Sequence, residues 1–139
     1  MSYHLKKIAV GIETVERLFI KQKIIKESYG TILHTTRNMP KKREDLIKTG
    51  SMFWIIKRNV LVRQKILDIV SVVRTDGSRG CEIELDKNLI KVIPTPMKPF
   101  QGWRYYLEED IPKDLNLNEE TDQDLPENIN SELIKLGLY

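Results

Sequence analysis

The sequence predicts an α+β fold, a small bent β-barrel of mixed or antiparallel strands accompanied by two main helices. Two segments with helical spacing occur early in the chain, and short strand-like segments joined by hairpin signals dominate after residue 50. One of these later segments changes its apolar face part-way along, as strands do at the corners of barrels. The pattern argues against a doubly wound parallel sheet.

Strands and helices alternate in the first part of the chain. Residues 4–12 and 31–37 have the alternation or β-branched content of strands. Residues 13–28 are predicted to form a helix, for which Gly30 is the stop signal. Pro40 fits the first position of a second helix, which Gly50 closes. The inward stripe of the first helix is expected to contain Val15, Leu18, Phe19, Gln22 and Ile25.

Later in the chain, strands are expected over residues 51–57, 60–74, 80–86 and 88–93, the last ended by prolines. The faces of residues 60–74 lose phase between Lys65 and Asp68, which predicts a bulge or bend there. Thr75-Asp76-Gly77 is a hairpin signal.

Residues 1–115 are expected to form a single domain, followed by an acidic, partly flexible segment, 116–139, that ends in a short helix. The single cysteine, Cys81, suits a reducing compartment, and no apolar run has the length of a signal peptide core or a membrane span. A cytoplasmic protein is therefore expected. Neither a metal-ligand spacing nor a nucleotide-binding glycine loop is present, so no metal and no cofactor are expected.

Charge is distributed unevenly along the chain. Residues 1–107 contain 21 Lys and Arg against 10 Asp and Glu, a balance of +11, whereas residues 108–139 have a balance of −8. A basic body favours contact with a polyanion, and the acidic end could shield that body. A solvated surface whose two halves neutralise each other explains the same numbers.

Two segments carry candidate binding residues. Lys41, Lys42 and Arg43 are expected in the first turn of the second helix, where cations oppose the helix dipole, and Arg37 precedes them. Such a mismatch fits an anion site, but it also fits a basic cluster splayed into water. In PFQGWRYY, rings interleaved with Arg104 suit the stacking of an unpaired base, or else an aromatic plug at one end of the barrel. The expected stacking residues are Trp54, Trp103 and Tyr105, and Lys57 and Arg63 are further candidate anion contacts from the central strands.

Several motifs together resemble a known family. HLKKIAVG, HTTRNMPKKREDL, GSMFWIIK, RQKILDI and PFQGWRYY…DIPKDL are similar to an uncharacterised, DUF1489-like family found mainly in alphaproteobacteria. Arg58-Asn59 departs from it, since the family more often has a glycine after the lysine. That family implies no activity. A fold-level likeness to the PUA-like superfamily, with its ASCH, EVE and YTH branches, implies a bent barrel that binds RNA or a modified base.

Three functional hypotheses follow. The favoured one is a non-catalytic module that binds RNA or a modified base, in which the basic residues contact phosphate and the rings contact bases. The second is an ASCH-like enzyme acting on a small nucleotide or nucleoside, with Lys57, Thr36 and Glu82 in one pocket. The third is an adaptor whose acidic tail binds a basic partner. The oligomeric state is not predicted.

Overall fold

The computed structural model of the protein describes residues 2–115. Its elements, in chain order, are β1 (Tyr3–Ile8), α1 (Val15–Tyr29), β2 (Ile32–Thr36), α2 (Arg43–Thr49), β3 (Ser51–Ile56), β4 (Asn59–Val73), β5 (Arg79–Leu85), β6 (Ile90–Pro96), β7 (Trp103–Leu107) and the short 3₁₀ helix η1 (Glu108–Asp110). The predicted α+β class is confirmed. The predicted acidic segment and terminal helix, 116–139, lie outside the described residues.

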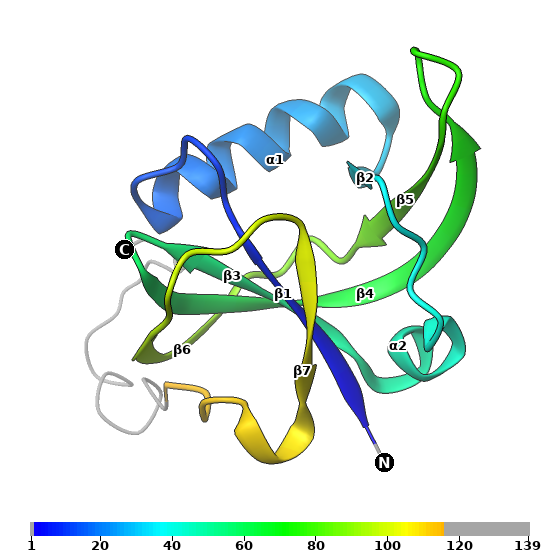
Figure 1. The fold of residues 1–139 in the computed structure, drawn as a ribbon. Helices are drawn as coiled ribbons and strands as arrows, with labels where there is room; N and C mark the ends of the chain where they lie inside the picture. The colour runs from blue at the N-terminus through cyan, green and yellow to red at the C-terminus, as the bar shows by residue number, and fades with distance from the viewer. Residues whose placement is uncertain (1, 116–139) are drawn as a thin grey trace.

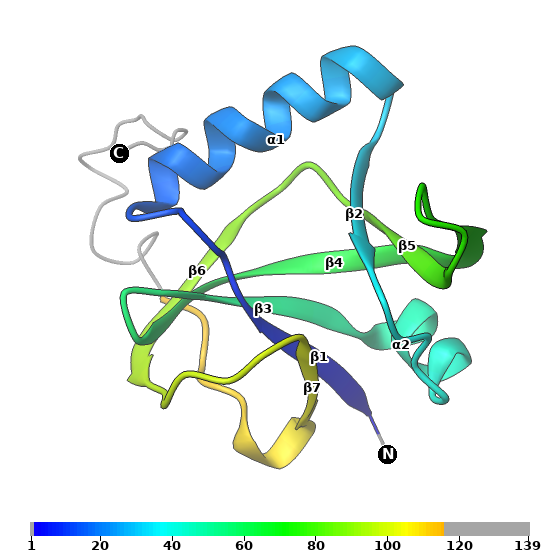
Figure 2. The same cartoon turned by 45° about the horizontal axis from the view of Figure 1, so that its top comes forward.

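The seven strands of the described part form one mixed sheet, in the order β2–β5–β4–β3–β1–β7, with β6 paired to the first half of β4. β1 and β3 are parallel, and the other ladders are antiparallel. β5 and β6 pair one after the other with β4, since Leu85 lies opposite Ile66 and Ile90 lies opposite Arg63. Figure 1 shows the long curve of β4, and Figure 2 shows α1 lying to one side of β3 and β4.

The sheet has a hydrophobic core on each face. β3 supplies both, because all six of its residues are buried and alternate residues point to opposite sides. Met52, Trp54 and Ile56 join the core beneath α1, whereas Phe53 and Ile55 join a smaller core with Val60, Val92 and Tyr106. A strand buried on both faces reads as the continuous apolar run that the sequence has there.

Both helices are positioned by their ends. The hydroxyl of Thr14 accepts a hydrogen bond from the backbone N–H of Arg17, and Gly30 ends α1 in the left-handed conformation with φ of 82°. Leu18 and Gln22 of the predicted stripe are buried, but Phe19 is 43% exposed. At Gly50, where α2 meets β3, a Cβ atom would lie 2.7 Å from the carbonyl oxygens of Leu46 and Tyr3, so only glycine fits without rearrangement.

The predicted bulge between Lys65 and Asp68 is confirmed, because the β4–β5 register shifts between Ile66 and Asp68. Gly77 provides the expected hairpin turn, with φ of 87°. Two expected strands differ in extent, because β1 ends at Ile8 and not at residue 12, and β6 continues past Pro94 to Pro96. In addition, PFQGWRYY contains the start of a strand, β7, that the sequence did not predict. In the described part of the chain no backbone ladder joins β2 to β7, the two ends of the strand order. The sheet is therefore open, and the predicted barrel is not confirmed.

A buried polar cluster connects α1 to the sheet. The side chain of Gln64 on β4, which is fully buried, accepts hydrogen bonds from Gln22 Nε2 (2.9 Å) and from Trp54 Nε1 (3.0 Å). Its own amide donates to Gln22 Oε1 and to the carbonyl of Asp86, both at 2.7 Å. Every polar atom of Gln64 is therefore paired, which is the condition for burying such a group without a large cost.

Removing Gln64 is expected to destabilise the fold strongly. Gln64→Leu leaves the Trp54 N–H and the Gln22 amide buried without partners, which should lower the free energy of unfolding by about 2–4 kcal/mol. Urea denaturation measures this change, with Gln101→Leu at an exposed position as the matched control, expected within about 0.5 kcal/mol of the parent. A Gln64→Leu protein as stable as the Gln101→Leu protein would contradict the structural role of the cluster.

Candidate functional site

A lysine between two tryptophans marks the face of the sheet beneath α1. On β1, Lys7 pairs with Trp54 of β3 on one side and with Trp103 of β7 on the other. Paired residues of neighbouring strands share a face, so the three side chains form a row across the sheet. Leu5 and Ala9, two residues to either side of Lys7, belong to the core on that face. A lysine on an otherwise apolar face departs from the usual burial pattern.

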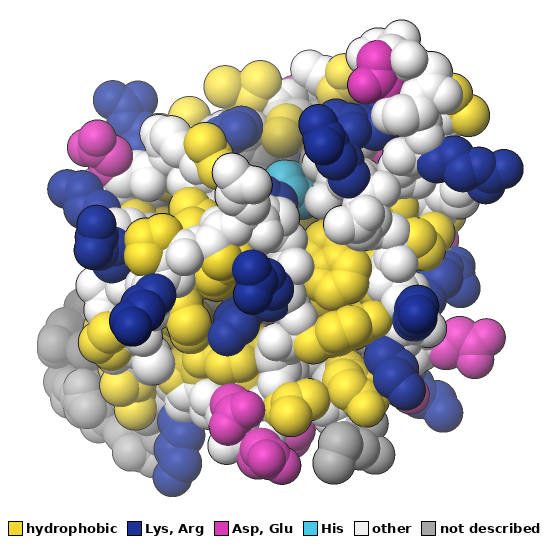
Figure 3. All heavy atoms as spheres, in the orientation of Figure 1, with side chains coloured by type: hydrophobic (Ala, Val, Ile, Leu, Met, Phe, Trp, Pro, Cys, Tyr) yellow, Lys and Arg dark blue, Asp and Glu magenta, His cyan; other side chains and the backbone are white. Residues whose placement is uncertain are grey.

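A cavity of about 100 Å³, here called the α1 cavity, lies over one end of this row. Its polar lining consists of Lys7, Lys21 and Gln22 from β1 and α1, and His34 from β2, and Trp54 forms part of its wall. Figure 3 shows the face of the molecule seen in Figure 1, with hydrophobic side chains in its middle, lysine and arginine side chains among and around them, and acidic side chains towards the periphery.

The charged side chains that line the α1 cavity, Lys7 and Lys21, are both positive. Burial, followed by the positive charge of Lys21, lowers the pKa of Lys7. Burial, followed by the charges of Lys7 and Lys21, lowers the pKa of His34 to about 4. His34 is therefore neutral near pH 7, with its ring edge-on to Trp54 at 5.2 Å between centroids. Among the described residues, its Nε2 is a buried atom without a hydrogen-bond partner.

Beside the cavity, an aromatic surface joins β7 to the segment that follows β2. We define this aromatic surface as Tyr3, Trp103 and Tyr105 together with residues 37–42. The Trp103 Nε1 donates to the carbonyl of Asn38 (2.9 Å), and the backbone N–H of Lys42 donates to the Tyr105 hydroxyl (3.1 Å). Tyr105 makes edge contacts with Tyr3 and Trp103 at 5.7 and 5.0 Å. Side chains of β7, at one end of the strand order, thus contact the segment that follows β2, at the other end.

The segment that contains Arg37, Lys41 and Lys42, here called the basic segment, lies before α2 and not in its first turn. α2 begins at Arg43, so Pro40, Lys41 and Lys42 precede the helix and the first turn carries Glu44 and Asp45. The expected clash of three cations with the helix dipole was therefore wrong, because only Arg43 lies inside the helix. Arg37, Lys41 and Lys42 are exposed, and the Lys42 Nζ lies 5.1 Å from the ring centre of Tyr3.

Arg43 is held away from the aromatic surface. Its guanidinium pairs with the Asp68 carboxylate at 2.9 Å and donates to the carbonyl of Ile69. Both partners lie at the bulge of β4, so Arg43 fastens α2 to the bend of the sheet. A guanidinium with two intramolecular partners is a poor candidate for a phosphate contact, although it was predicted as one.

Three further predicted contact residues lie away from the aromatic surface. Trp54 is 3% exposed and forms an inner wall of the cavity, so it offers no open stacking surface. Lys57 lies in the β3–β4 turn, with φ of 51°. Arg104 points to the other face of β7, 5.1 Å from the ring centre of Phe100. The structure therefore does not place Arg104 in one cleft with Trp103 and Arg37.

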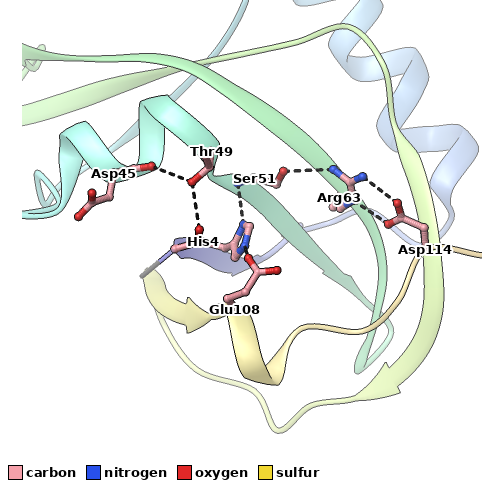
Figure 4. Close-up of polar contacts among 8 residues, drawn as sticks. His4, Asp45, Thr49, Ser51, Arg63, Glu108 and Asp114 are labelled. Carbon is pink, nitrogen blue, oxygen red and sulfur yellow. Dashed lines mark hydrogen bonds and ion pairs between the residues drawn. The ribbon is translucent and has the colours of Figure 1, made fainter.

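Arg63 belongs to a polar cluster on the same opposite face, drawn in Figure 4. It makes a two-pronged ion pair with Asp114, at 2.7 and 2.8 Å, and donates to the Ser51 hydroxyl at 3.3 Å. His4 accepts a hydrogen bond from the backbone N–H of Ser51 through Nδ1 and contacts Glu108 through Nε2 at 2.7 Å. This histidine meets the Ser51 backbone and not its hydroxyl, so the cluster is not a Ser–His–Glu nucleophile arrangement.

The residues proposed for an enzyme do not come together. Thr36 pairs with Cys81, and Cys81 with Ser71 near the far end of β4. Lys57 directly precedes β4 at its other end, where Asn59 pairs with Pro96. Thr36 shares the face of Cys81, whereas Glu82, the next residue of β5, points to the opposite face of the sheet, and Lys57 lies in the β3–β4 turn. Lys57, Thr36 and Glu82 therefore do not share one pocket, and that hypothesis fails on geometry.

Lys7 and Lys21 were missed as site residues, although the sequence carries a signal for each. Lys7 alternates with Leu5 and Ala9, which places a cation on the buried face of the strand. Lys21 is three residues after Leu18 and next to Gln22, at the edge of the buried stripe of α1. His34 lies edge-on to the Trp54 ring, so this histidine is packed against the core as well as lining the cavity.

His34 makes stability depend on pH. Its pKa is about 4 in the folded protein, against an ordinary value of 6.5, so the unfolded chain binds more protons between these values. The contribution of neutral His34 to the free energy of unfolding is fully present above the unfolded pKa of 6.5 and is lost as the pH falls from about 7 towards 4. We expect a loss of about 2 kcal/mol between pH 7 and pH 5 that His34→Gln abolishes. Urea denaturation at both pH values tests this, and an equal pH dependence in the two proteins would disprove it.

Comparison with known proteins identifies a family. The family described as Protein of unknown function (DUF1489) matches residues 5–139. No curated protein and no solved structure matches the chain. Within residues 2–115, no helix is long and apolar enough to cross a membrane, and no three His, Cys, Asp or Glu side chains are grouped as metal ligands.

Proposed function

Since the chain belongs to the DUF1489 family, whose function is unknown, we propose a function from its own geometry: a non-catalytic module that binds single-stranded RNA on the aromatic surface. The finer proposal on the fold is a PUA-like architecture. It is supported by the bend of β4 and by the contacts between β7 and the segment after β2.

The observation that carries the proposal is the attachment of two partly exposed rings to a basic segment. Trp103 and Tyr105 lie on the edge strand β7 and are hydrogen-bonded to Asn38 and Lys42. These bonds fix the rings beside Arg37, Lys41 and Lys42, whose side chains are exposed. Rings held in place next to exposed cations provide stacking for bases and charge for phosphates in one place.

The arrangement favours a single strand over a duplex. Stacking on an aromatic ring requires a base face that is free, which a paired base does not offer. The cations are long side chains on an irregular segment and contact a backbone without demanding one duplex geometry. Each stacked base contributes about 1–3 kcal/mol by this mechanism.

Neutralising the basic segment should weaken RNA binding and its salt dependence. For Arg37→Gln/Lys41→Gln/Lys42→Gln, we expect the slope of log K against log salt to become less steep by about two, as three phosphate contacts are lost from a single strand. Fluorescence anisotropy with labelled poly(U) and poly(A) oligonucleotides of about twelve residues, between about 50 and 200 mM salt, measures it. DNA of the same length and an RNA duplex are the comparison ligands.

The matched control is Lys57→Gln/Lys87→Gln/Lys113→Gln, which removes three exposed cations from the β3–β4 turn and from segments flanking β6. It changes net charge equally, so a general electrostatic effect would affect both triple variants alike. Equal losses, or no binding of any oligonucleotide by the parent protein, would refute the proposed surface.

Trp103 should contribute through its ring. Trp103→Leu removes the stacking face and the bond to Asn38, so RNA affinity should fall about tenfold, whereas Trp103→Phe keeps a ring and should lose less. Far-ultraviolet circular dichroism and thermal unfolding establish whether both variants fold. Equal affinity of folded Trp103→Leu and parent protein would exclude stacking on this residue.

A further inference from the structure

The α1 cavity contains basic chemistry that the aromatic surface does not use. Lys7 and Lys21 both line it, and His34 lines it from β2. Among the described residues that form its wall there is no aspartate or glutamate. The one polar neighbour left, Gln22, already exchanges two hydrogen bonds with Gln64.

Such a cluster is unfavourable by itself. Lys7 and Lys21 repel each other across a partly buried space, which is one reason that the pKa of Lys7 is lowered. His34 stays neutral there and has a buried Nε2 without a partner in the described part of the chain. An anion would relieve the repulsion and give that nitrogen a partner, so one ligand would satisfy all three side chains.

The rest of the wall is hydrophobic. Ten of the fourteen lining residues are apolar, including Ile12, Leu18 and Leu85. An inorganic oxyanion would leave these residues facing a hydrated ion, whereas an organic acid would cover them with its hydrocarbon part. An apolar cavity of about 150 Å³ holds benzene, which has six non-hydrogen atoms, so a cavity of about 100 Å³ accommodates about four and suits a short acid.

We propose that the α1 cavity binds a small organic carboxylate, whose carboxyl group pairs with Lys7 and Lys21 and takes a hydrogen bond from His34 Nε2. The hydrocarbon part lies against the apolar wall beneath α1. This site is separate from RNA binding on the aromatic surface and does not depend on it. Trp54, which forms part of the wall, is a built-in reporter through its indole N–H.

The test uses the full chain and pairs of acids and neutral isosteres. Acetate, propionate and butyrate are titrated against acetamide, propionamide and butyramide, with inorganic phosphate and adenosine monophosphate as further probes. Binding is followed by NMR shifts of the Trp54 indole N–H and of the His34 ring. We expect at least one carboxylate to bind saturably, at least about tenfold more tightly than its amide, because the amide lacks the charge.

The His34 ring gives a second readout that a merely apolar pocket would not produce. A bound anion favours the imidazolium form, so saturating carboxylate should raise the pKa of His34 from about 4. The charged groups facing His34 are Lys7 of β1 and Lys21 of α1, both cationic, so the rise is attributable to the ligand.

Lys21→Gln and Lys23→Gln form a matched pair on α1, since both residues are exposed but only Lys21 lines the cavity. Carboxylate affinity should fall several-fold in Lys21→Gln and stay unchanged in Lys23→Gln. Lys7→Met should show the larger loss, about tenfold, and its folding is checked by the amide spectrum.

Three results would overturn the proposal. They are equal binding of acids and amides, which indicates an apolar pocket only; binding of phosphate or adenosine monophosphate in preference to every carboxylate; and no saturable binding of any probe by the folded parent. RNA binding measured on the same sample keeps the two proposals distinguishable, because either can fail alone.

Discussion

The bend of β4 is the constraint on which the rest of the structure depends. β4 pairs with β3, β5 and β6, and its register shifts at Ile66–Asp68. In a flat sheet, β2 and β3 would be separated by three strand spacings, about 14 Å. Instead, the rings of His34 on β2 and Trp54 on β3 lie 5.2 Å apart. The sheet therefore curls around the core beneath α1, and the α1 cavity lies inside that curl.

The strands at the two ends of the sheet, β2 and β7, show the same curl over a larger separation in the strand order. β2 and β7 are five places apart in the strand order, about 24 Å in a flat sheet. Trp103 on β7 nevertheless donates to Asn38, two residues after β2, at 2.9 Å. Side chains thus bridge a gap that no backbone ladder closes in the described residues. Arg43 supports this arrangement from outside by fastening α2 to the bulge through Asp68.

Much of the fold was predictable from local pattern, because periodicity and turn chemistry are local. The buried stripe of α1 and the phase break near Lys65 were both visible as spacing of apolar residues. β7 was missed because aromatic residues interleaved with Gln101, Gly102 and Arg104 fit a loop as well as a strand, and its pairing with β1 spans about a hundred residues of chain. Such pairing is decided by tertiary contacts, which local propensity does not contain.

The candidate site was less predictable, for a related reason. Sequence reasoning found Trp103, Tyr105 and the 37–42 segment from composition, but it also grouped them with Arg63 and Arg104, which point to the other face. Whether a lysine faces water or a cavity depends on which strands flank it. The two adjacent lysines of β1 show this directly, because alternate residues of a strand point to opposite faces. Lys7 lines the α1 cavity, whereas Lys6 lies on the other face, with its Nζ 4.7 Å from the ring centre of Tyr106 in the smaller core.

Lys7 also connects the two proposed sites physically. It stands between Trp54, a wall of the α1 cavity, and Trp103, a member of the aromatic surface. A carboxylate that pairs with Lys7 offsets a positive charge on the residue that is paired with Trp103 across the β1–β7 ladder. When both sites are occupied, the charge of Lys7 therefore couples carboxylate binding in the cavity to RNA binding on the aromatic surface. Its sign follows from Coulomb's law: a carboxylate in the cavity offsets the Lys7 charge and so slightly weakens the binding of RNA on the aromatic surface.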